Sequence, residues 1–304
     1  MNALLRSLIE DPPPKLVIEL TTDGVVGVLR NGDGSTMVQR AERSFAPGTL
    51  EPAPTRPNIV NAGEMAAALG GVLDDLGQRK GSATALILPD ASSRLTVLDF
   101  VDDSLPSSSD ERLKRIRERL EKAVPFDIDA ARISFQVSSL DPGHSVLIVL
   151  TPAEIVRQYE SALSQLGLWS GYVTTSTAAA MNLLADGDMT LFAKLAPSGN
   201  MTLAAIENGV VRLVRNVDLG SLNESSESPL LDEMLADIYP TQVFISDTLG
   251  QSVDRLVLCG FGDLLTSALA RFPKELGCPV ETLKLGERSV ERTDAGILGY
   301  LSLS

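Results

Sequence analysis

The sequence predicts an α/β protein that contains one fold twice, as two lobes around a cleft. Residues 16–43 and 191–217 each show a strand, a polar glycine turn, a second strand and an Asn-Gly turn into a third strand. After each of these meanders, helical and strand patterns alternate, which is typical of α/β proteins. The 304 residues are enough for two lobes with separate cores.

In the first half, two sequence patterns predict helix starts. Asn61 with Glu64 three residues later is a capping pattern, and Thr151 before Pro152, with Glu154 following, is another. The elements expected after the first meander are a proline-rich loop at 46–57, a helix at 61–77, strands at 83–89 and 95–100, a helix at 111–124, strands at 133–137 and 145–150, a helix at 152–166, a strand at 172–174 and a helix at 177–184.

The second half follows the repeated meander with the same kind of alternation. The expected elements are a helix at 230–238, a strand at 255–259, a glycine turn at 260–263, a helix at 264–272, an edge strand at 278–283 and a terminal helix at 295–302.

Composition limits the classes of function. The net charge of −14 argues against nucleic-acid binding, which needs clustered Lys and Arg. Cys259 and Cys278 are the only cysteines and lack CxxC spacing, so we expect a reduced cytoplasmic protein. Neither a signal peptide nor a membrane-spanning apolar stretch is visible, and we expect a soluble chain. Four apolar residues near the start could still dock on an apolar surface: Leu4, Leu5, Leu8 and Ile9.

The residues predict no catalytic centre or metal site. His144 is the only histidine and lies in a predicted turn, which does not suit a nucleophile–His–Asp site. Too few His and Cys residues are present for a zinc site, and no GxxxxGK[ST] motif exists. Gly260-Phe261-Gly262 after a strand lacks the third glycine of a dinucleotide-binding turn.

The order of these elements resembles the actin-like (ribonuclease H-like) ATPase superfamily. Within it, the chain is similar to the PilM family of type IV pilus assembly, which is related to the cytoplasmic domain of GspL in type II secretion. The strongest local match is the predicted helix at 113–124 followed by Pro125-Phe-Asp-Ile-Asp129 and a strand. The resemblance implies a small α+β domain inserted in the first lobe. The implied division is a flexible tail at 1–14, a first lobe at 15–93 and 151–186, the insertion at 94–150 and a second lobe at 187–304.

The resemblance also implies three loops for ATP between the lobes. The residues at these places are Thr21, Thr22 and Gly24 in the first loop, Ser198 and Gly199 in the second, and Gly260 and Gly262 in the third.

All three loops depart from the family pattern. Glu19 stands in place of the first Asp, and the lysine position near Val26 is apolar. In the second loop, Leu195 replaces the metal-ordering Asp and Pro197 removes an amide donor. In the third, Phe261 would crowd an adenine or ribose, with a ring that swings aside as the alternative. The sequence therefore predicts a pseudo-ATPase without cofactor, metal or catalytic residues, and leaves weak ATP binding open.

For the partner, the resemblance implies the N-terminal tail of a PilN-like single-pass inner-membrane protein. The tail would lie in a groove between the first lobe and the insertion, which recruits the chain to the cytoplasmic face of the membrane. An insertion with an exposed strand edge suits peptide capture. The candidate groove residues are Val97, Phe100, Val124, Phe126 and Phe135, for which core packing is the other interpretation.

Two further functions remain open from the sequence. One is an actin-fold sugar or acetate kinase, for which Glu19 and Asp188 are poorly placed acids. The other is a filament-forming or chaperone-like actin homologue. The sequence decides neither the oligomeric state nor whether a pilus or a secretion system is served.

Overall fold

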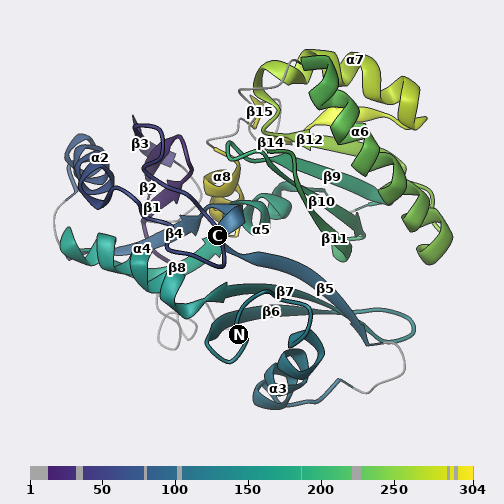
Figure 1. Cartoon of the computed structure of the whole chain (residues 1–304), viewed down its shortest axis with the longest axis horizontal. Helices are drawn as coiled ribbons and strands as arrows, with labels where there is room; N and C mark the ends of the chain where they lie inside the picture. The colour runs from purple at the N-terminus through teal and green to yellow at the C-terminus, as the bar shows by residue number, and fades with distance from the viewer. Residues whose placement is uncertain are drawn as a thin grey trace.

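The computed structural model describes residues 13–31, 37–78, 81–100, 105–185, 187–220, 227–285, 288–290 and 294–303. Two lobes are each built on a five-stranded sheet, and a smaller domain with a three-stranded sheet lies beside them (Figure 1). The tail predicted at residues 1–14 lies outside the described part except for Pro13 and Pro14.

The two large sheets have the same topology, so the predicted duplication is confirmed. In each sheet the meander runs outward from a central strand, and two parallel strands follow on its other side. The first sheet has the order β3-β2-β1-β4-β8, and the second has the order β11-β10-β9-β12-β13. The strands are β1 Leu16–Leu20, β2 Gly24–Arg30, β3 Met37–Ser44, β4 Ala83–Leu88 and β8 Trp169–Thr175, then β9 Thr190–Leu195, β10 Asn200–Glu207, β11 Val210–Asp218, β12 Arg255–Cys259 and β13 Val280–Thr282.

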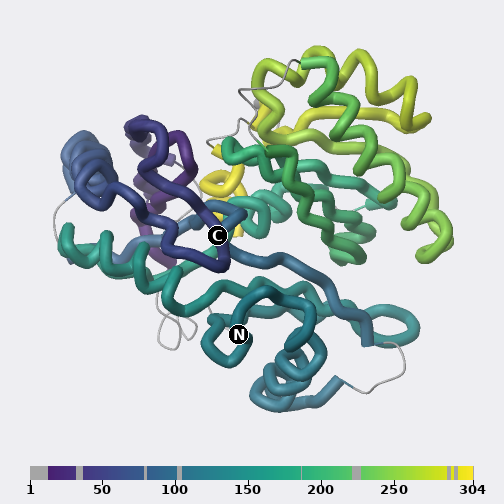
Figure 2. The backbone as a smooth tube through the Cα atoms, in the orientation of Figure 1, coloured from purple at the N-terminus to yellow at the C-terminus, as the bar shows by residue number. Residues whose placement is uncertain are grey.

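Helices pack on both faces of each sheet. The outer face of the first sheet packs on α2 Ala62–Asp75 and α4 Ala153–Gln165, and that of the second on α6 Glu227–Phe244 and α7 Leu265–Leu276. The inner faces of both sheets meet around the short helices α5 Ser176–Ala180 and α8 Ala295–Leu301. Figure 2 shows these two helices side by side at the centre of the molecule. Every residue of α8 is buried.

The small domain joins both lobes. Its strands β5 Arg94–Phe100, β6 Ala131–Ser139 and β7 His144–Pro152 form an antiparallel sheet in the order β5-β7-β6, which packs against α3 Ser109–Leu120. Its chain ends continue directly into the first lobe. Two hydrogen bonds tie it to β11 of the second lobe: Ser145 Oγ donates to the Val211 carbonyl at 2.8 Å, and Asn216 Nδ2 donates to the Leu95 carbonyl at 3.2 Å.

Helix starts and ends differ in part from the prediction. The Asn61 cap is confirmed, since its side chain accepts from the Glu64 amide at 3.1 Å. The Thr151 cap is wrong, because Thr151 remains in β7 and its hydroxyl bonds to Ser93 Oγ at 2.6 Å.

Two other helices have unexpected lengths. Helix α3 ends at Leu120, before the predicted end at residue 124. Helix α6 continues through Pro240, because the buried side of the helix extends to Thr241 and the following π-turn begins with buried Ile245.

The remaining short elements are the 3₁₀ turns η1 Asp90–Ser92, η2 Met181–Leu183 and η4 Gly262–Leu264, the π-turn η3 Ile245–Leu249, and the two-residue strands β14 Lys284–Leu285 and β15 Arg288–Ser289. None of the helices in the described ranges combines the length and apolar character needed to cross a bilayer.

Candidate functional site: the interlobe cleft and the groove beside it

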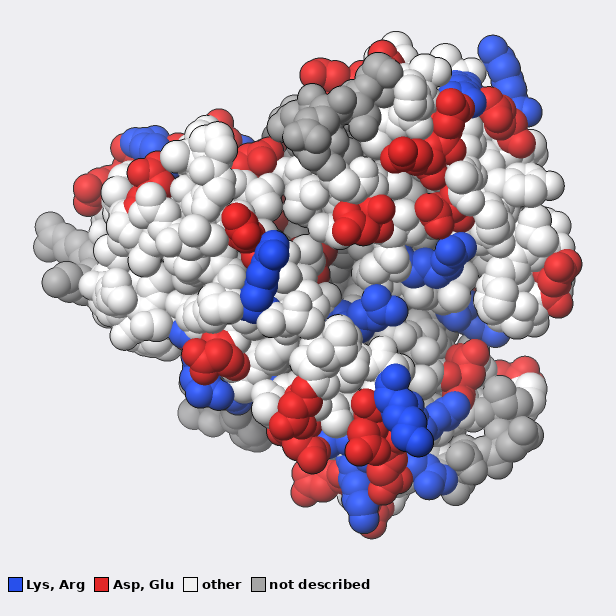
Figure 3. Space-filling view, in the orientation of Figure 1, with Lys and Arg blue, Asp and Glu red and all other residues white. Residues whose placement is uncertain are grey.

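A cavity of about 890 Å³ opens where the two lobes and the small domain meet. Its wall combines both glycine turns of the meanders, the proline-rich loop and the small domain, and includes Thr22, Asp23, Arg94, Phe126 and Ser198. Figure 3 shows the molecule hollowed at its centre, with acidic and basic side chains both near the opening. The hollow is thus polar and carries charges of both signs.

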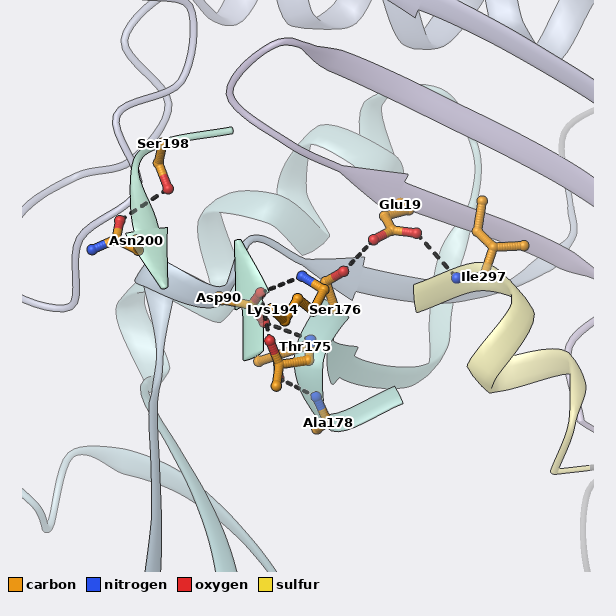
Figure 4. Close-up of polar contacts among 10 residues, drawn as sticks. Glu19, Asp90, Thr175, Ser176, Ala178, Lys194, Ser198, Asn200 and Ile297 are labelled. Atoms are coloured by element: carbon orange, nitrogen blue, oxygen red, sulfur yellow. Dashed lines mark hydrogen bonds and ion pairs between the residues drawn. The ribbon is translucent and has the colours of Figure 1, made fainter. Parts of the chain in front are cut away.

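An ion pair joins the two lobes at the floor of this cavity. Lys194 on β9 places its Nζ 2.7 Å from Asp90 Oδ2, in the turn after β4, and both side chains are buried (Figure 4). Asp90 also accepts from the Thr177 amide at 2.6 Å and the Thr177 hydroxyl at 2.8 Å. Burial alone would lower the pKa of Lys194, but the Asp90 carboxylate raises it above its ordinary value, so the ammonium keeps its charge.

Glu19, on β1, is completely buried beside this pair. Its carboxyl group accepts from Ser176 Oγ at 2.5 Å and from the Ile297 amide of α8 at 3.0 Å (Figure 4). Burial raises the pKa of Glu19 from 4.5 to about 7, although the hydrogen bond from Ser176 and the charge of Lys194 lower it. Glu19 therefore changes protonation near neutral pH and links β1 to α8.

The turn of the first meander satisfies its own amide groups. Thr21 Oγ1 accepts from the amides of Asp23 and Gly24, both at 3.2 Å. Gly24 is needed for close packing, since a Cβ there would lie 2.3 Å from the Arg43 carbonyl oxygen. These donors bond to the turn itself, whereas a phosphate-binding turn would direct them at a ligand.

The turn of the second meander is closed in a similar way. The Gly199 amide donates to the Ala196 carbonyl at 3.0 Å, and Ser198 Oγ donates to Asn200 Oδ1 at 2.9 Å (Figure 4). Gly199 has φ +85°, and a Cβ there would collide with the Gly220 carbonyl. Pro197 completes the turn without an amide donor.

Little room remains between the two turns. The hollow bounded by Thr21, Thr22, Lys194, Pro197 and Ser198 measures about 10 Å³. That is about the volume of one water-sized probe, too small for a phosphate group. Among the described residues, no group of three or more His, Cys, Asp and Glu is arranged to hold a metal ion.

The third predicted loop lies away from the cavity. Phe261 is buried in the core of the second lobe, where its ring packs edge-on against Phe272 at 6.3 Å. The expectation that Phe261 crowds the cleft is therefore wrong. Gly260 has φ +79° and approaches Leu195 closely. Of the predicted nucleotide residues, the structure brings together Thr21, Thr22 and Ser198, while Gly24, Gly199, Gly260 and Gly262 do not line the described walls of either hollow.

A second hollow, of about 200 Å³, lies between the first lobe and the small domain. It lies between β8, the edge strand of the first sheet, and one face of the small sheet, formed by side chains of β6 and β7. We call it the edge groove. Its lining residues are Leu88, Arg132, Ser134, Val149, Thr151, Val156, Glu160, Val173, Thr174 and Thr175.

The residues predicted for peptide binding lie around the core of the small domain. Phe100 is buried and covered by the Arg119 guanidinium, 4.6 Å from its ring centre. Val124, Phe126 and Phe135 are partly buried against the same core, and Val97 is half-buried on β5. None of the five belongs to the described lining of the edge groove. The sequence missed Val156 and Glu160 of α4 because nothing local shows which face of that helix meets another domain.

No known family model matches the sequence, and no curated protein matches it. Solved structures match its fold. A chain of the "PilM-PilN type IV pilus biogenesis complex" matches with a TM-score of 0.77 at 17% identity, covering 96% of this chain and 98% of that one.

Two further structures match less closely. A Bacteroides thetaiotaomicron protein with an "actin-like ATPase fold and unknown function" has a TM-score of 0.54 at 11% identity and 98% coverage of both chains. The ethanolamine utilization protein EutJ from Carboxydothermus hydrogenoformans has a TM-score of 0.50 at 13% identity, covering 97% of this chain and 91% of that one. The chain therefore has the actin-like fold that its sequence predicted.

Proposed function

We propose that this actin-fold protein is a non-catalytic scaffold of a type IV pilus or related secretion complex. It would hold the N-terminal tail of a PilN-like membrane protein at the cytoplasmic face of the inner membrane. The similarity to the PilM–PilN structure over nearly the whole of both chains supports this role.

The edge groove is the observation that carries the proposal. Strand β8 pairs with only one neighbour among the described strands, so it has a free edge along which an extended peptide can align, opposite the face formed by β6 and β7. The groove offers apolar contacts from Val156 and Val173. Backbone pairing would give affinity, and these side chains would select apolar residues of the tail.

The charge of the chain as a whole supports a basic tail. The groove wall itself carries one acid and one base, Glu160 and Arg132, and Glu160 accepts from Ser170 Oγ at 2.8 Å, which holds its carboxylate in place. The chain as a whole has a net charge of −14, which favours the approach of a cationic segment.

The cleft supports the pseudo-ATPase part of the proposal. In the place where the resemblance implies phosphates and magnesium, the protein has its own cation, Lys194, paired with Asp90. The amides of Asp23, Gly24 and Gly199 are bonded within the protein, and the innermost hollow, between the turns and Lys194, measures only about 10 Å³. We infer that the lobes stay closed without a nucleotide, cofactor or metal.

A second function, an ATP-binding protein or small-molecule kinase, is favoured by one observation. The cavity of about 890 Å³ next to Thr22 and Ser198 is large enough for a nucleotide. Isothermal titration with ATP and Mg²⁺ separates the two functions: the scaffold predicts no binding or weak binding without turnover, and micromolar binding with turnover favours the kinase.

The test of the scaffold is a titration with a peptide. The probe is a synthetic peptide with the sequence of the N-terminal cytoplasmic tail of a PilN-like membrane protein. We expect Ser134→Trp, which fills the edge groove from exposed Ser134, to weaken binding at least about tenfold, equivalent to about 1.4 kcal/mol. Gln136→Trp, on the same strand but outside the groove, is the matched control and should bind like the parent.

Equal binding by the parent, Ser134→Trp and Gln136→Trp would show that the tail binds elsewhere. Absence of binding to the parent at millimolar peptide would overturn the scaffold itself.

A further inference from the structure

Two aromatic side chains are exposed on β8, on the opposite side of that strand from α4. Trp169 is 53% exposed and Tyr172 is 39% exposed. A bulge between them places Trp169 opposite Ala83 and Tyr172 opposite Ala85, so both project from the same face of the sheet. On that face the Tyr172 ring lies 5.3 Å from the ring of Tyr300 in α8. We call Trp169 and Tyr172 the aromatic strip.

The chain that leads into β1 is anchored at this strip. Arg30 Nη2 donates to the Pro13 carbonyl at 3.1 Å, and the Tyr300 hydroxyl donates to the Pro14 carbonyl at 3.2 Å. The Pro14 ring lies against β8: a Cβ on Gly171, in the bulge, would be only 3.1 Å from Pro14 Cγ. The segment before Pro13 therefore starts beside the aromatic strip.

That segment has an apolar side of matching size. In residues 1–12, Leu4, Leu5, Leu8 and Ile9 recur at a spacing of one helical turn; Arg6 and Ser7 fall between them, and Asn2 and Glu10 flank them. Twelve residues reach about 18 Å as a helix and about 40 Å when extended. Either length is enough for the segment to reach the strip from the anchor at Pro13 and Pro14.

We propose that residues 1–12 dock in cis on the aromatic strip, with Leu4, Leu5, Leu8 and Ile9 against Trp169 and Tyr172. The docking removes from water two large, half-exposed rings and a four-residue apolar stripe at once. The Arg30 and Tyr300 hydrogen bonds supply the anchor that makes this an intramolecular contact. This inference is independent of the proposed scaffold function, because it concerns the other side of β8.

The chain has its own probe, since Trp169 is its only tryptophan. The test compares the full-length protein with a variant in which Leu4, Leu5, Leu8 and Ile9 are all Ser, by tryptophan emission and acrylamide quenching. We expect the variant to emit at longer wavelength and to be quenched about twofold more efficiently, because the indole loses its apolar cover. A matched control with Asn2→Ser, Arg6→Gln and Glu10→Gln keeps the apolar stripe and should behave like the parent.

Three further measurements complete the design. Circular dichroism and the midpoint of thermal unfolding show that the variant is folded. A synthetic peptide of residues 1–12, added to the folded variant, should restore the parent emission and quenching. Gly171→Ala, which pushes against Pro14, should raise quenching in the otherwise unchanged chain.

Two results would overturn the proposal. Identical emission and quenching in the parent and the four-serine variant would show that the strip is not covered by this segment. Protection of Trp169 in the parent that disappears on dilution would assign the cover to a second copy of the chain instead.

Discussion

The two lobes share one topology but carry opposite charges at equivalent positions. Glu19 is the fourth of five residues in β1, and Lys194 is the fifth of six in β9; each precedes the last residue of its strand. Each is central in its sheet, with an antiparallel meander strand on one side and a parallel strand on the other.

The protein accommodates these two buried groups differently. Lys194 keeps its charge through an ion pair with Asp90 across the cleft. Glu19 accepts hydrogen bonds from the Ser176 hydroxyl and the Ile297 amide, neither of which is a cation, and its pKa rises to about 7 because of burial. The equivalent positions therefore join different parts of the molecule: Lys194 links one lobe to the other, and Glu19 links β1 to α8.

The largest expected loss of stability comes from substitution of Lys194, the buried group of the second lobe. Lys194→Met leaves the Asp90 carboxylate buried and unpaired, which should lower the free energy of unfolding by about 3–5 kcal/mol. Urea denaturation measures it. The double variant Lys194→Met/Asp90→Asn should recover much of the loss, since neither charge is then left alone. A loss below about 1 kcal/mol in the single variant would mean that the ion pair does not hold the lobes together.

For the first-lobe member, stability should depend on pH. The folded pKa of Glu19 is about 7, raised by burial from 4.5, so the folded protein binds this proton more tightly than the unfolded chain. The contribution of Glu19 to the free energy of unfolding is fully present below pH 4.5. It decreases as pH rises to about 7, by roughly 3 kcal/mol in total.

The matched measurement is unfolding of the parent and of Glu19→Gln between pH 4.5 and 8. The free energy of unfolding of the parent, relative to that of Glu19→Gln, should decrease as pH rises across this range. Glu118→Gln, at an exposed position of α3, is the control and should follow the parent. Parallel pH curves for the parent and Glu19→Gln would contradict the raised pKa.

A smaller effect is expected from the space around Glu19. A Cβ on Gly296 of α8 would lie 2.6 Å from Glu19 Oε1, so Gly296→Ala must displace the carboxyl group. We expect a loss of about 1–3 kcal/mol in thermal unfolding. Gly63→Ala in α2, where the nearest atom is 3.6 Å away, serves as the control and should be neutral or stabilising. Equal behaviour of the two variants would mean that α8 moves freely relative to β1.

The smallest expected losses of stability come from substitutions in the two glycine turns. Thr21→Val removes the oxygen that accepts from Asp23 and Gly24, and should cost about 1 kcal/mol in chemical denaturation. Ser198→Ala removes a single side-chain bond, to Asn200, and should cost less than about 1 kcal/mol. If instead Thr21→Val created phosphate binding, the turn would be a suppressed ligand site.

Several features were predictable because their signals are local. Both meanders, the Asn61 cap and the strand Arg255–Cys259 follow from short patterns of apolar residues, glycine and capping side chains. The Thr151 cap failed for a non-local reason: Ser93, from a distant part of the chain, bonds to its hydroxyl and β7 continues through it. The prediction that Phe261 lies in the cleft failed for a similar reason, because its ring packs against the ring of Phe272 in the core.

The duplicated α/β fold could be predicted from consecutive residues, because the repeated turns and the apolar spacing are local patterns. Which groups meet in the cleft depends instead on how distant parts of the chain pack. Lys194 and Asp90 are 104 positions apart, and Ile297 is 278 positions from Glu19. The edge groove likewise exists only because β8 pairs with β4 on one side and faces β6 and β7 on the other. Burial and pairing of charges depend on the whole packed molecule, so no local pattern could reveal them.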